Sequence, residues 1–207
     1  MNCFLTGTDT DVGKTYVAAL LVRALRRAGL DTVAMKPICC GDRDDAEKLR
    51  EASGEKNITL DEVNPVWLPM PAAPSVAAAR AGREVDLDLI RATFARLRKS
   101  HRSLLVEGAG GWLVPIARNY LVADLARDFA LPVVVVARNR LGVLNHTLLT
   151  VESIRARGCE CAGVILNNID DPDEVSHTNR AALEELLDVP ILFEIAQNQR
   201  VIELGIA

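Results

Sequence analysis

One segment near the N-terminus combines glycine, lysine and hydroxyl side chains in a pattern suited to binding phosphate. It reads Gly7-Thr8-Asp9-Thr10-Asp11-Val12-Gly13-Lys14-Thr15 and lies between an apolar run and an amphipathic helix pattern, the context of a phosphate-binding loop. Backbone N–H groups of such a loop hold phosphate oxygens. The lysine bridges the β- and γ-phosphates, and the hydroxyl that follows it binds Mg²⁺. We therefore expect Lys14 and Thr15 to hold a nucleoside triphosphate and its metal.

The loop departs from the general spacing by one residue. The general pattern has its first glycine six residues before the lysine, where this chain has Thr8, and the glycine stands one position earlier, at Gly7. Asp9 and Asp11 are also unusual, because two carboxylates beside a triphosphate would repel it. They either point away from the phosphates or face a substrate that carries amines.

Two charged residues stand where apolar strand candidates end. Lys36 precedes Pro37, and Glu107 precedes the small residues Gly108-Ala109-Gly110-Gly111. In a doubly wound sheet, ligands collect at the carboxyl ends of the strands. A lysine there can stabilise charge on a transferring phosphoryl group, and an acid can take a metal-binding role. A surface lysine and an ordinary glycine-rich turn are the structural alternatives.

Further polar residues are open to two interpretations. The amide of Asn167 suits an adenine edge, but the pair Asn167-Asn168 could equally form a turn. Asp44 and Asp45 follow the second strand candidate. Either could reach the metal, and a solvated acidic face is the alternative.

Short apolar runs alternate with helical patterns, which predicts an α/β fold with a mostly parallel twisted sheet and helices on both faces. The expected fold is that of a single-domain P-loop NTPase covering residues 1–207. The stretch Asn64–Pro74 contains four prolines and is expected to be an irregular connection. The expected strands are Asn2–Thr6, Thr32–Lys36, Ser103–Glu107, Pro132–Ala137, Ala162–Asn167 and Pro190–Phe193. The expected helices run from about Val17 to Ala28, from Leu87 (with Asp86 as N-cap) to Lys99, from Val143 to Arg157 and from Glu174 to Leu187.

Composition narrows the class of protein. Hydrophobic residues make up 49% of the chain, the net charge is −4 and the pI is about 5.5, so a filled core is expected and nucleic-acid binding is not. The longest apolar run, Leu131–Ala137, is too short to span a bilayer, and no secretory signal is visible. We expect a cytoplasmic protein without a membrane partner. Its five cysteines should be free thiols, with Cys3 and Cys161 buried in strands and no zinc site.

Several motifs together resemble the dethiobiotin synthetase family. They are the loop from Gly7 to Thr15, Lys36-Pro37, Val106-Glu107-Gly108-Ala109-Gly110-Gly111, Leu141-Gly142-Val143-Leu144-Asn145-His146 and, more weakly, Val63-Asn64-Pro65. The family shares the shifted first glycine. The resemblance, which extends from Cys3 to about Ile195, implies an ATP- and Mg²⁺-dependent cyclo-ligase of biotin synthesis. Such an enzyme converts diaminopelargonic acid and CO₂ to dethiobiotin through a carbamate and a carbamic–phosphoric anhydride.

The resemblance also implies roles for individual residues. Lys36 looks like the catalytic lysine, helped by Lys14 and Thr10. The Mg²⁺ set would be Thr15, Asp45 and Glu107. The other nucleotide contacts would be Asp11, Val12, Gly13, Tyr16, Gly108, Ala109, Gly110, Asn167, Asn168, Ile195, Ala196, Gln197 and Asn198. Substrate would meet Thr10, Lys36, Cys40, Glu107, Gly110 and Gly111, and Asn145 from the neighbouring subunit of a homodimer.

Two residues depart from the family pattern. Cys40 stands where a serine usually contacts substrate, and a thiol is a weaker donor than a hydroxyl. Ala196 stands where the family often has a proline. The main alternative function is a partitioning-type switch ATPase that acts through protein partners. Such proteins carry an extra lysine early in the loop, where this chain has Asp9. A cobyrinate-type ligase is disfavoured because it typically adds a glutaminase domain, for which 207 residues leave no room.

Overall fold

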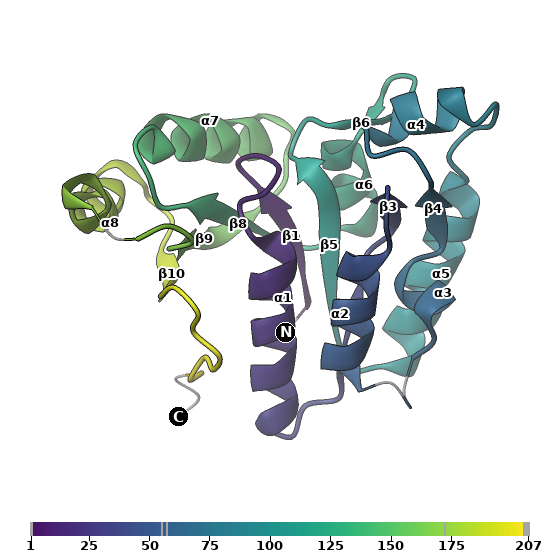
Figure 1. The fold of residues 1–207 in the computed structure, drawn as a ribbon, viewed down its shortest axis with the longest axis horizontal. Helices are drawn as coiled ribbons and strands as arrows, with labels where there is room; N and C mark the ends of the chain where they lie inside the picture. The colour runs from purple at the N-terminus through teal and green to yellow at the C-terminus, as the bar shows by residue number, and fades with distance from the viewer. Residues whose placement is uncertain (1, 55, 57, 172, 205–207) are drawn as a thin grey trace.

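A parallel sheet of six strands forms the centre of the protein (Figure 1). The computed structural model describes residues 2–54, 56, 58–171 and 173–204, so Met1 and residues 205–207 of the expected domain lie outside the described residues. The strands are nearly all buried runs rich in Val, Ile and Leu, as expected when helices cover both faces. In spatial order they are β10 (Ile191–Ile195), β9 (Cys161–Asn167), β8 (Val133–Arg138), β1 (Asn2–Gly7), β5 (Ser103–Gly111) and β2 (Thr32–Met35).

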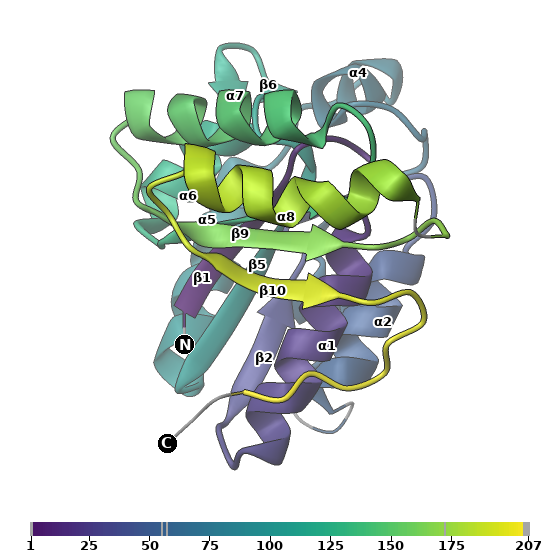
Figure 2. The same ribbon diagram turned by 90° about the vertical axis from the view of Figure 1, so that its left-hand side faces the viewer.

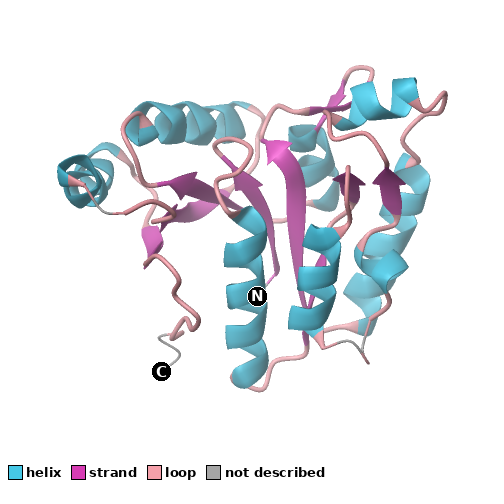
Figure 3. Cartoon of the chain, viewed as in Figure 1, coloured by secondary structure: helices cyan, strands magenta, loops and turns pink. Residues whose placement is uncertain are grey.

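Helices pack on both faces of this sheet. Helices α1 (Lys14–Arg27) and α2 (Asp44–Ser53) lie on one face, and α5 (Leu87–Ser100) and α6 (Val122–Phe129) lie on the other (Figures 1 and 3). At the end of the sheet formed by β8, β9 and β10, α7 (Val143–Ala156) packs on β8, and α8 (Glu174–Leu186) packs on α7 and β10 (Figure 2). The expected α/β class with a parallel sheet is confirmed.

The segment between β2 and β5 builds a small unit beside the main sheet. It contains β3 (Ile38–Cys40), α2, α3 (Leu60–Val63), β4 (Val66–Leu68) and α4 (Pro74–Arg80) before α5 begins. Strands β3 and β4 pair with each other in parallel. A short antiparallel pair, β6 (Pro115–Ala117) and β7 (Tyr120–Leu121), follows β5.

The expectation that Asn64–Pro74 is wholly irregular is wrong. Strand β4 lies inside this stretch, and α4 begins at its last residue, Pro74. Pro65 and Pro69 flank the strand rather than interrupt it, so the ladder keeps its N–H donors, and Pro74 occupies the helix start, where a missing N–H costs nothing.

Other boundaries differ in informative ways. Strand β2 ends at Met35, because the N–H of Lys36 donates to the carbonyl of Val63 and turns the chain out of the sheet. Strand β5 continues past Glu107 to Gly111. Asp86 caps α5, accepting from the N–H of Leu89, as expected. Cys3 is buried, whereas Cys161 is only half-buried.

No helix among the residues in the described ranges is both long and apolar enough to cross a membrane.

A buried asparagine holds the backbone next to Lys36. The Asn64 side chain is 1% exposed and donates to the carbonyl of Lys36 at 2.9 Å and to that of Val66 at 2.8 Å. Its amide oxygen accepts from Nε of Arg43 at 3.0 Å. This asparagine therefore ties the end of α3 to the residue that leaves β2.

We predict that Asn64→Ala lowers the free energy of unfolding by about 1–3 kcal/mol, because it removes two buried hydrogen bonds to backbone carbonyls. The matched control is Asp61→Ala, which also removes a partner of Arg43 but an exposed one, so it should cost less than about 1 kcal/mol. Urea denaturation of both variants measures the difference, and equal midpoints would contradict the structural role of Asn64.

Candidate functional site

The phosphate loop follows β1, and its shape explains the position of its first glycine. A Cβ on Gly7 would lie 2.7 Å from the carbonyl oxygen of Asp9 and 2.9 Å from Nζ of Lys14, contacts that no side chain can make. Nζ of Lys14 in turn donates to that carbonyl at 3.0 Å. The loop closes tightly around the lysine, so the glycine is needed at Gly7 and not at Thr8.

The N-terminus of α1 has free N–H groups that face the loop. Its N-cap residue, Gly13, has a left-handed φ of 83° and offers no capping side chain, and the first turn of the helix carries no acid. A phosphate can therefore accept from this helix end without competing with a protein carboxylate.

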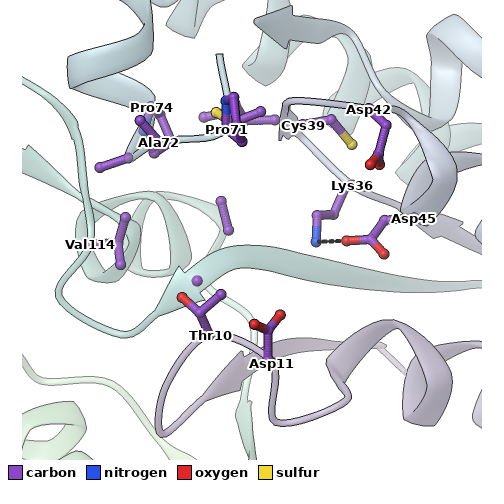
Figure 4. Close-up of a pocket in the computed structure, with 15 residues that line it drawn as sticks. Thr10, Asp11, Lys36, Cys39, Asp42, Asp45, Pro71, Ala72, Pro74 and Val114 are labelled. Carbon is purple, nitrogen blue, oxygen red and sulfur yellow. Dashed lines mark hydrogen bonds and ion pairs between the residues drawn. The ribbon is translucent and has the colours of Figure 1, made fainter. Parts of the chain in front are cut away.

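Four side chains meet beside the loop, three from β5, α1 and α2 and one, Lys36, from the residue that follows β2. Oε1 of Glu107 on β5 accepts from Nζ of Lys36 at 2.5 Å and from the hydroxyl of Thr15 on α1 at 2.8 Å. Nζ of Lys36 also donates to Oδ2 of Asp45 on α2 at 3.1 Å (Figure 4). Strand register explains the meeting, because Met35 lies opposite Val106, and Glu107 lies opposite Leu5.

Burial and charge set the protonation of this cluster. Burial alone lowers the pKa of Lys36, but the carboxylates of Glu107 and Asp45 raise it by more, so the pKa lies above its ordinary value. Burial raises the pKa of Asp45, and Lys36 then lowers it below its usual range. Burial lowers the pKa of Lys14 to about 8, and the Lys36 charge adds to the decrease. Lys36 is therefore a permanent cation, while Lys14 can titrate near neutral pH.

Two adjoining cavities open at this cluster. The larger has a volume of about 470 Å³ and the smaller about 280 Å³. The smaller lies over the loop and is lined by Gly13, Lys14, Thr15, Tyr16, Lys48 and Glu107. The larger has apolar walls from Ile38, Pro71, Ala72, Ala73, Pro74, Ala109 and Val114, together with Cys39, Cys40 and Asp42 (Figure 4). Five residues line both cavities, namely Thr10, Asp11, Lys36, Asp45 and Gly110.

The two loop carboxylates differ in position. Asp9 accepts from the N–H of Thr10 at 2.7 Å, so its carboxylate stabilises the loop itself. Asp11, held at a positive φ of 56°, lines both cavities. Asp9 lines neither cavity, which fits the interpretation that it points away from the phosphates, whereas the position of Asp11 fits the interpretation that it faces a substrate.

The cysteines of β3 are protonated thiols. Burial raises the pKa of Cys39 to about 12, and it also raises the pKa of Cys40. Cys40 lines the larger cavity, and there it offers only the weak S–H donor of a neutral thiol.

The asparagine pair at the end of β9 bonds to two different segments. The buried Nδ2 of Asn167 donates to the carbonyl of Val12 at 3.0 Å. Nδ2 of Asn168 donates to the carbonyl of Ile195 at 3.0 Å, and its Oδ1 accepts from Asn139 at 2.9 Å. The asparagine pair therefore links the phosphate loop to the segment Ile195–Asn198. In that segment, Gln197 donates to the carbonyl of Ile169.

Not every predicted site residue lies at the cavities. Asn145 is exposed on α7 and lines neither cavity, and Gly111 also lies outside both lining sets. Gly108 packs so closely against Phe4 and Val122 that a Cβ would lie 3.0 Å from each side chain. Sequence reasoning missed Asp42, Lys48 and the Pro71–Pro74 wall. For Lys48, its spacing of three residues from Asp45 was an available signal.

Comparison with known proteins decides the family. A family model described as an AAA domain matches residues 1–203. The ATP-dependent dethiobiotin synthetase of Akkermansia muciniphila is 46% identical over 99% of this chain and 96% of its own length. The synthetase of Methanococcus vannielii is 40% identical over 91% of this chain and 90% of its own length. The chain belongs to the ATP-dependent dethiobiotin synthetase family.

Solved structures outside this synthetase family share the fold. The septum site-determining protein MinD of Pyrococcus horikoshii, complexed with Mg-ADP, has a TM-score of 0.52 at 19% identity, covering 96% of this chain and 82% of that chain. The signal recognition particle receptor FtsY of Elizabethkingia anophelis has a TM-score of 0.56 at 13% identity, covering 99% of this chain and 62% of that chain. These likenesses show the P-loop NTPase-like fold alone, so they do not favour the switch ATPase over the ligase.

The lowered pKa of Lys14 predicts a pH dependence of nucleotide binding. As the pH rises through about 8, Lys14 of the free protein loses its proton, and a bound polyphosphate restores it. ATP affinity should therefore fall above that pH, by up to about tenfold per pH unit, with uptake of a proton on binding. Calorimetric titrations in two buffers of different ionisation enthalpy measure both effects. Adenosine is the control, because it does not engage Lys14, and a pH-independent ATP affinity without proton uptake would contradict the prediction.

Proposed function

We propose that this protein closes the ureido ring of dethiobiotin from diaminopelargonic acid, CO₂ and ATP. The observation that carries the proposal is the position of Lys36, which lines both the cavity over the phosphate loop and the larger, apolar-walled cavity. A cation at such a boundary can touch a nucleotide phosphate from one side and an acceptor from the other. High identity to named synthetases over nearly the whole chain supports the same assignment.

The reaction follows from the chemistry of the substrates. One amine of the diamine captures CO₂ as a carbamate, losing a proton. The carbamate oxygen attacks the γ-phosphorus of ATP, and ADP leaves, which forms a carbamic–phosphoric anhydride. The second amine then attacks the carbamate carbon and expels phosphate, closing the ring. Because most of the catalysis is positioning and charge stabilisation, the protein needs fixed donors rather than a nucleophile.

Charge stabilisation is assigned to the basic and hydroxyl groups of the loop and the β2 end. Lys36 neutralises the carbamate and the γ-phosphoryl oxygens as they approach, and Lys14 with Thr10 holds the phosphates. The apolar walls of the larger cavity suit the aliphatic chain of the diamine. The polar groups of the diamine are assigned to Asp11, Gly110 and the thiol of Cys40, which all line that cavity. Glu107 and Gly111 are assigned to the reacting groups.

The residues around Glu107 fit a magnesium ion. Oε2 of Glu107 is buried without a hydrogen-bond partner, and the Thr15 hydroxyl and the Asp45 carboxylate belong to the same cluster. No group of three or more His, Cys, Asp or Glu side chains suited to a metal occurs within the described ranges. Mg²⁺ needs fewer, because one or two carboxylates, a hydroxyl, phosphates and waters complete its shell. When bound, the ion offsets the negative charge of the β- and γ-phosphates.

The adenine is assigned to the segment Ile195–Asn198 and the asparagine pair. Asn167 and Asn168 link this segment to the phosphate loop through side-chain bonds. The hydroxyl of Tyr16, on the first turn of α1, donates to the carbonyl of Gln199.

A symmetric homodimer would complete the site. Asn145 lies on α7 between two exposed leucines, Leu141 at 79% and Leu149 at 58% exposure. Leu141 precedes the helix, whereas Asn145 and Leu149 are four apart on α7, so these two fall on one side of the helix. An exposed leucine beside Asn145 on the same face suits a self-complementary contact that carries Asn145 to the partner's substrate.

The reaction is tested by incubating the purified protein with diaminopelargonate, bicarbonate, ATP and Mg²⁺ and identifying the product by mass. We expect dethiobiotin, and phosphate release that requires the diamine. Equal phosphate release without the diamine would instead indicate a switch ATPase.

Lys36→Gln should lower turnover by about a hundred- to a thousand-fold while ATP binding survives. The variant also leaves Glu107 with a buried, unpaired charge, so folding must be checked by circular dichroism. Lys36→Arg keeps the charge but should recover little activity, because a planar guanidinium does not replace a compact ammonium. Near-full turnover of folded Lys36→Gln at saturating substrates would remove Lys36 from the mechanism.

Leu149→Asp should convert the dimer to monomers and lower activity, because it places a charge in the proposed apolar contact. Leu186→Asp is the control, since Leu186 is similarly exposed, at 55%, but lies on α8. Sedimentation velocity and turnover measure the effect. A fully active wild-type monomer at working concentration would rule the dimer out.

A further inference from the structure

Lys48 is a cation on the wall of the smaller cavity that belongs to none of the motifs above. It lies on α2, three positions after Asp45. Both residues line the cavity of about 280 Å³ together with Thr15 and Tyr16. Because residues three apart share a helix face, α2 presents a carboxylate and, one turn later, an ammonium to the same cavity.

The charges of the lining explain what this ammonium can do. The lining cations are Lys14, Lys36 and Lys48, and the lining carboxylates are Asp11, Asp45 and Glu107. Lys36 is paired with Asp45 and Glu107. A nucleoside triphosphate with one divalent cation is still an anion, and the two lysines without a carboxylate partner in this cluster can meet part of its remaining charge. Lys14 meets it from inside the loop.

Lys48 approaches from the open side. Its side chain is exposed, whereas Lys14 is buried. Its charge acts on the cluster. Burial raises the pKa of Asp45, Lys36 lowers this pKa, and Lys48 lowers it further. A long, flexible side chain at this position can turn toward a phosphate without disturbing the core.

We propose that Lys48 binds the phosphates of the nucleotide, closing the open side of the cavity opposite the phosphate loop. The proposal rests on the proposed function only in that a nucleotide enters this cavity, and it does not depend on the identity of the acceptor. It makes Lys48 a determinant of affinity for polyphosphates, separate from Lys36, which borders the acceptor.

The test compares Lys48→Ala and Lys48→Glu with Lys99→Ala. Lys99 is exposed in the last turn of α5 and lines neither cavity. Lys99→Ala therefore removes the same charge as Lys48→Ala, but away from the cavities. Calorimetry with Mg²⁺ gives dissociation constants for ATP, ADP and adenosine. Lys48→Ala should weaken ATP binding about two- to fivefold, as an exposed charge pair allows, and Lys48→Glu should weaken it more. The effect should be smaller for ADP, absent for adenosine, and reduced at high salt.

Two outcomes would overturn the proposal. ATP affinity of Lys48→Ala equal to that of Lys99→Ala would show that Lys48 does not meet the phosphates. Equal weakening of ATP and adenosine would show that the substitution acts through the fold. Because binding is measured without diamine or bicarbonate, the result stands apart from the carboxylation assay, and failure of that assay leaves it intact.

Discussion

The buried contact between Lys36 and Glu107 is the constraint on which the arrangement of the site depends. Both side chains are almost completely buried, and Nζ lies 2.5 Å from Oε1. Removing one partner of such a pair costs about 3–5 kcal/mol, because the other charge stays buried and unpaired. Three surrounding features keep the pair in place. Asn64 holds the backbone of Lys36, the strand register holds Glu107, and α2 supplies Asp45.

Much of this could be predicted from the sequence, for identifiable reasons. The six main strands were predicted because unbroken Val and Ile runs mark strands covered on both faces. Lys36, Glu107 and Asn167 were placed at one edge because polar residues ended those runs. The phosphate loop was recognisable despite its shifted glycine, and the structure supplies the reason in the space that a side chain at Gly7 would need.

What the sequence did not predict depends on contacts between distant segments. Helix α2 was missed because its charged residues hide the buried Ala46, Leu49 and Ala52, and with it the spacing of Asp45 and Lys48. Strand β4 was missed because prolines on both sides look like an interruption until the pairing with β3 is seen. The wall of the larger cavity at Pro71 and Pro74 follows from that pairing, so no local pattern could indicate it.

The wall of the larger cavity and the phosphate loop come from different segments of the chain. The loop, Glu107 and the asparagine pair come from the six-stranded sheet, whereas Cys40, Asp42 and the proline wall come from the excursion between β2 and β5. Lys36 is the residue at which the segment between β2 and β5 leaves the sheet. Substitutions in β3 or in the proline wall can therefore reshape the larger cavity, whereas α2 of the same segment contributes Asp45 and Lys48 to the cavity over the phosphate loop. The wall of the larger cavity can thus vary in shape while the strands that carry the phosphate loop and Glu107 stay fixed.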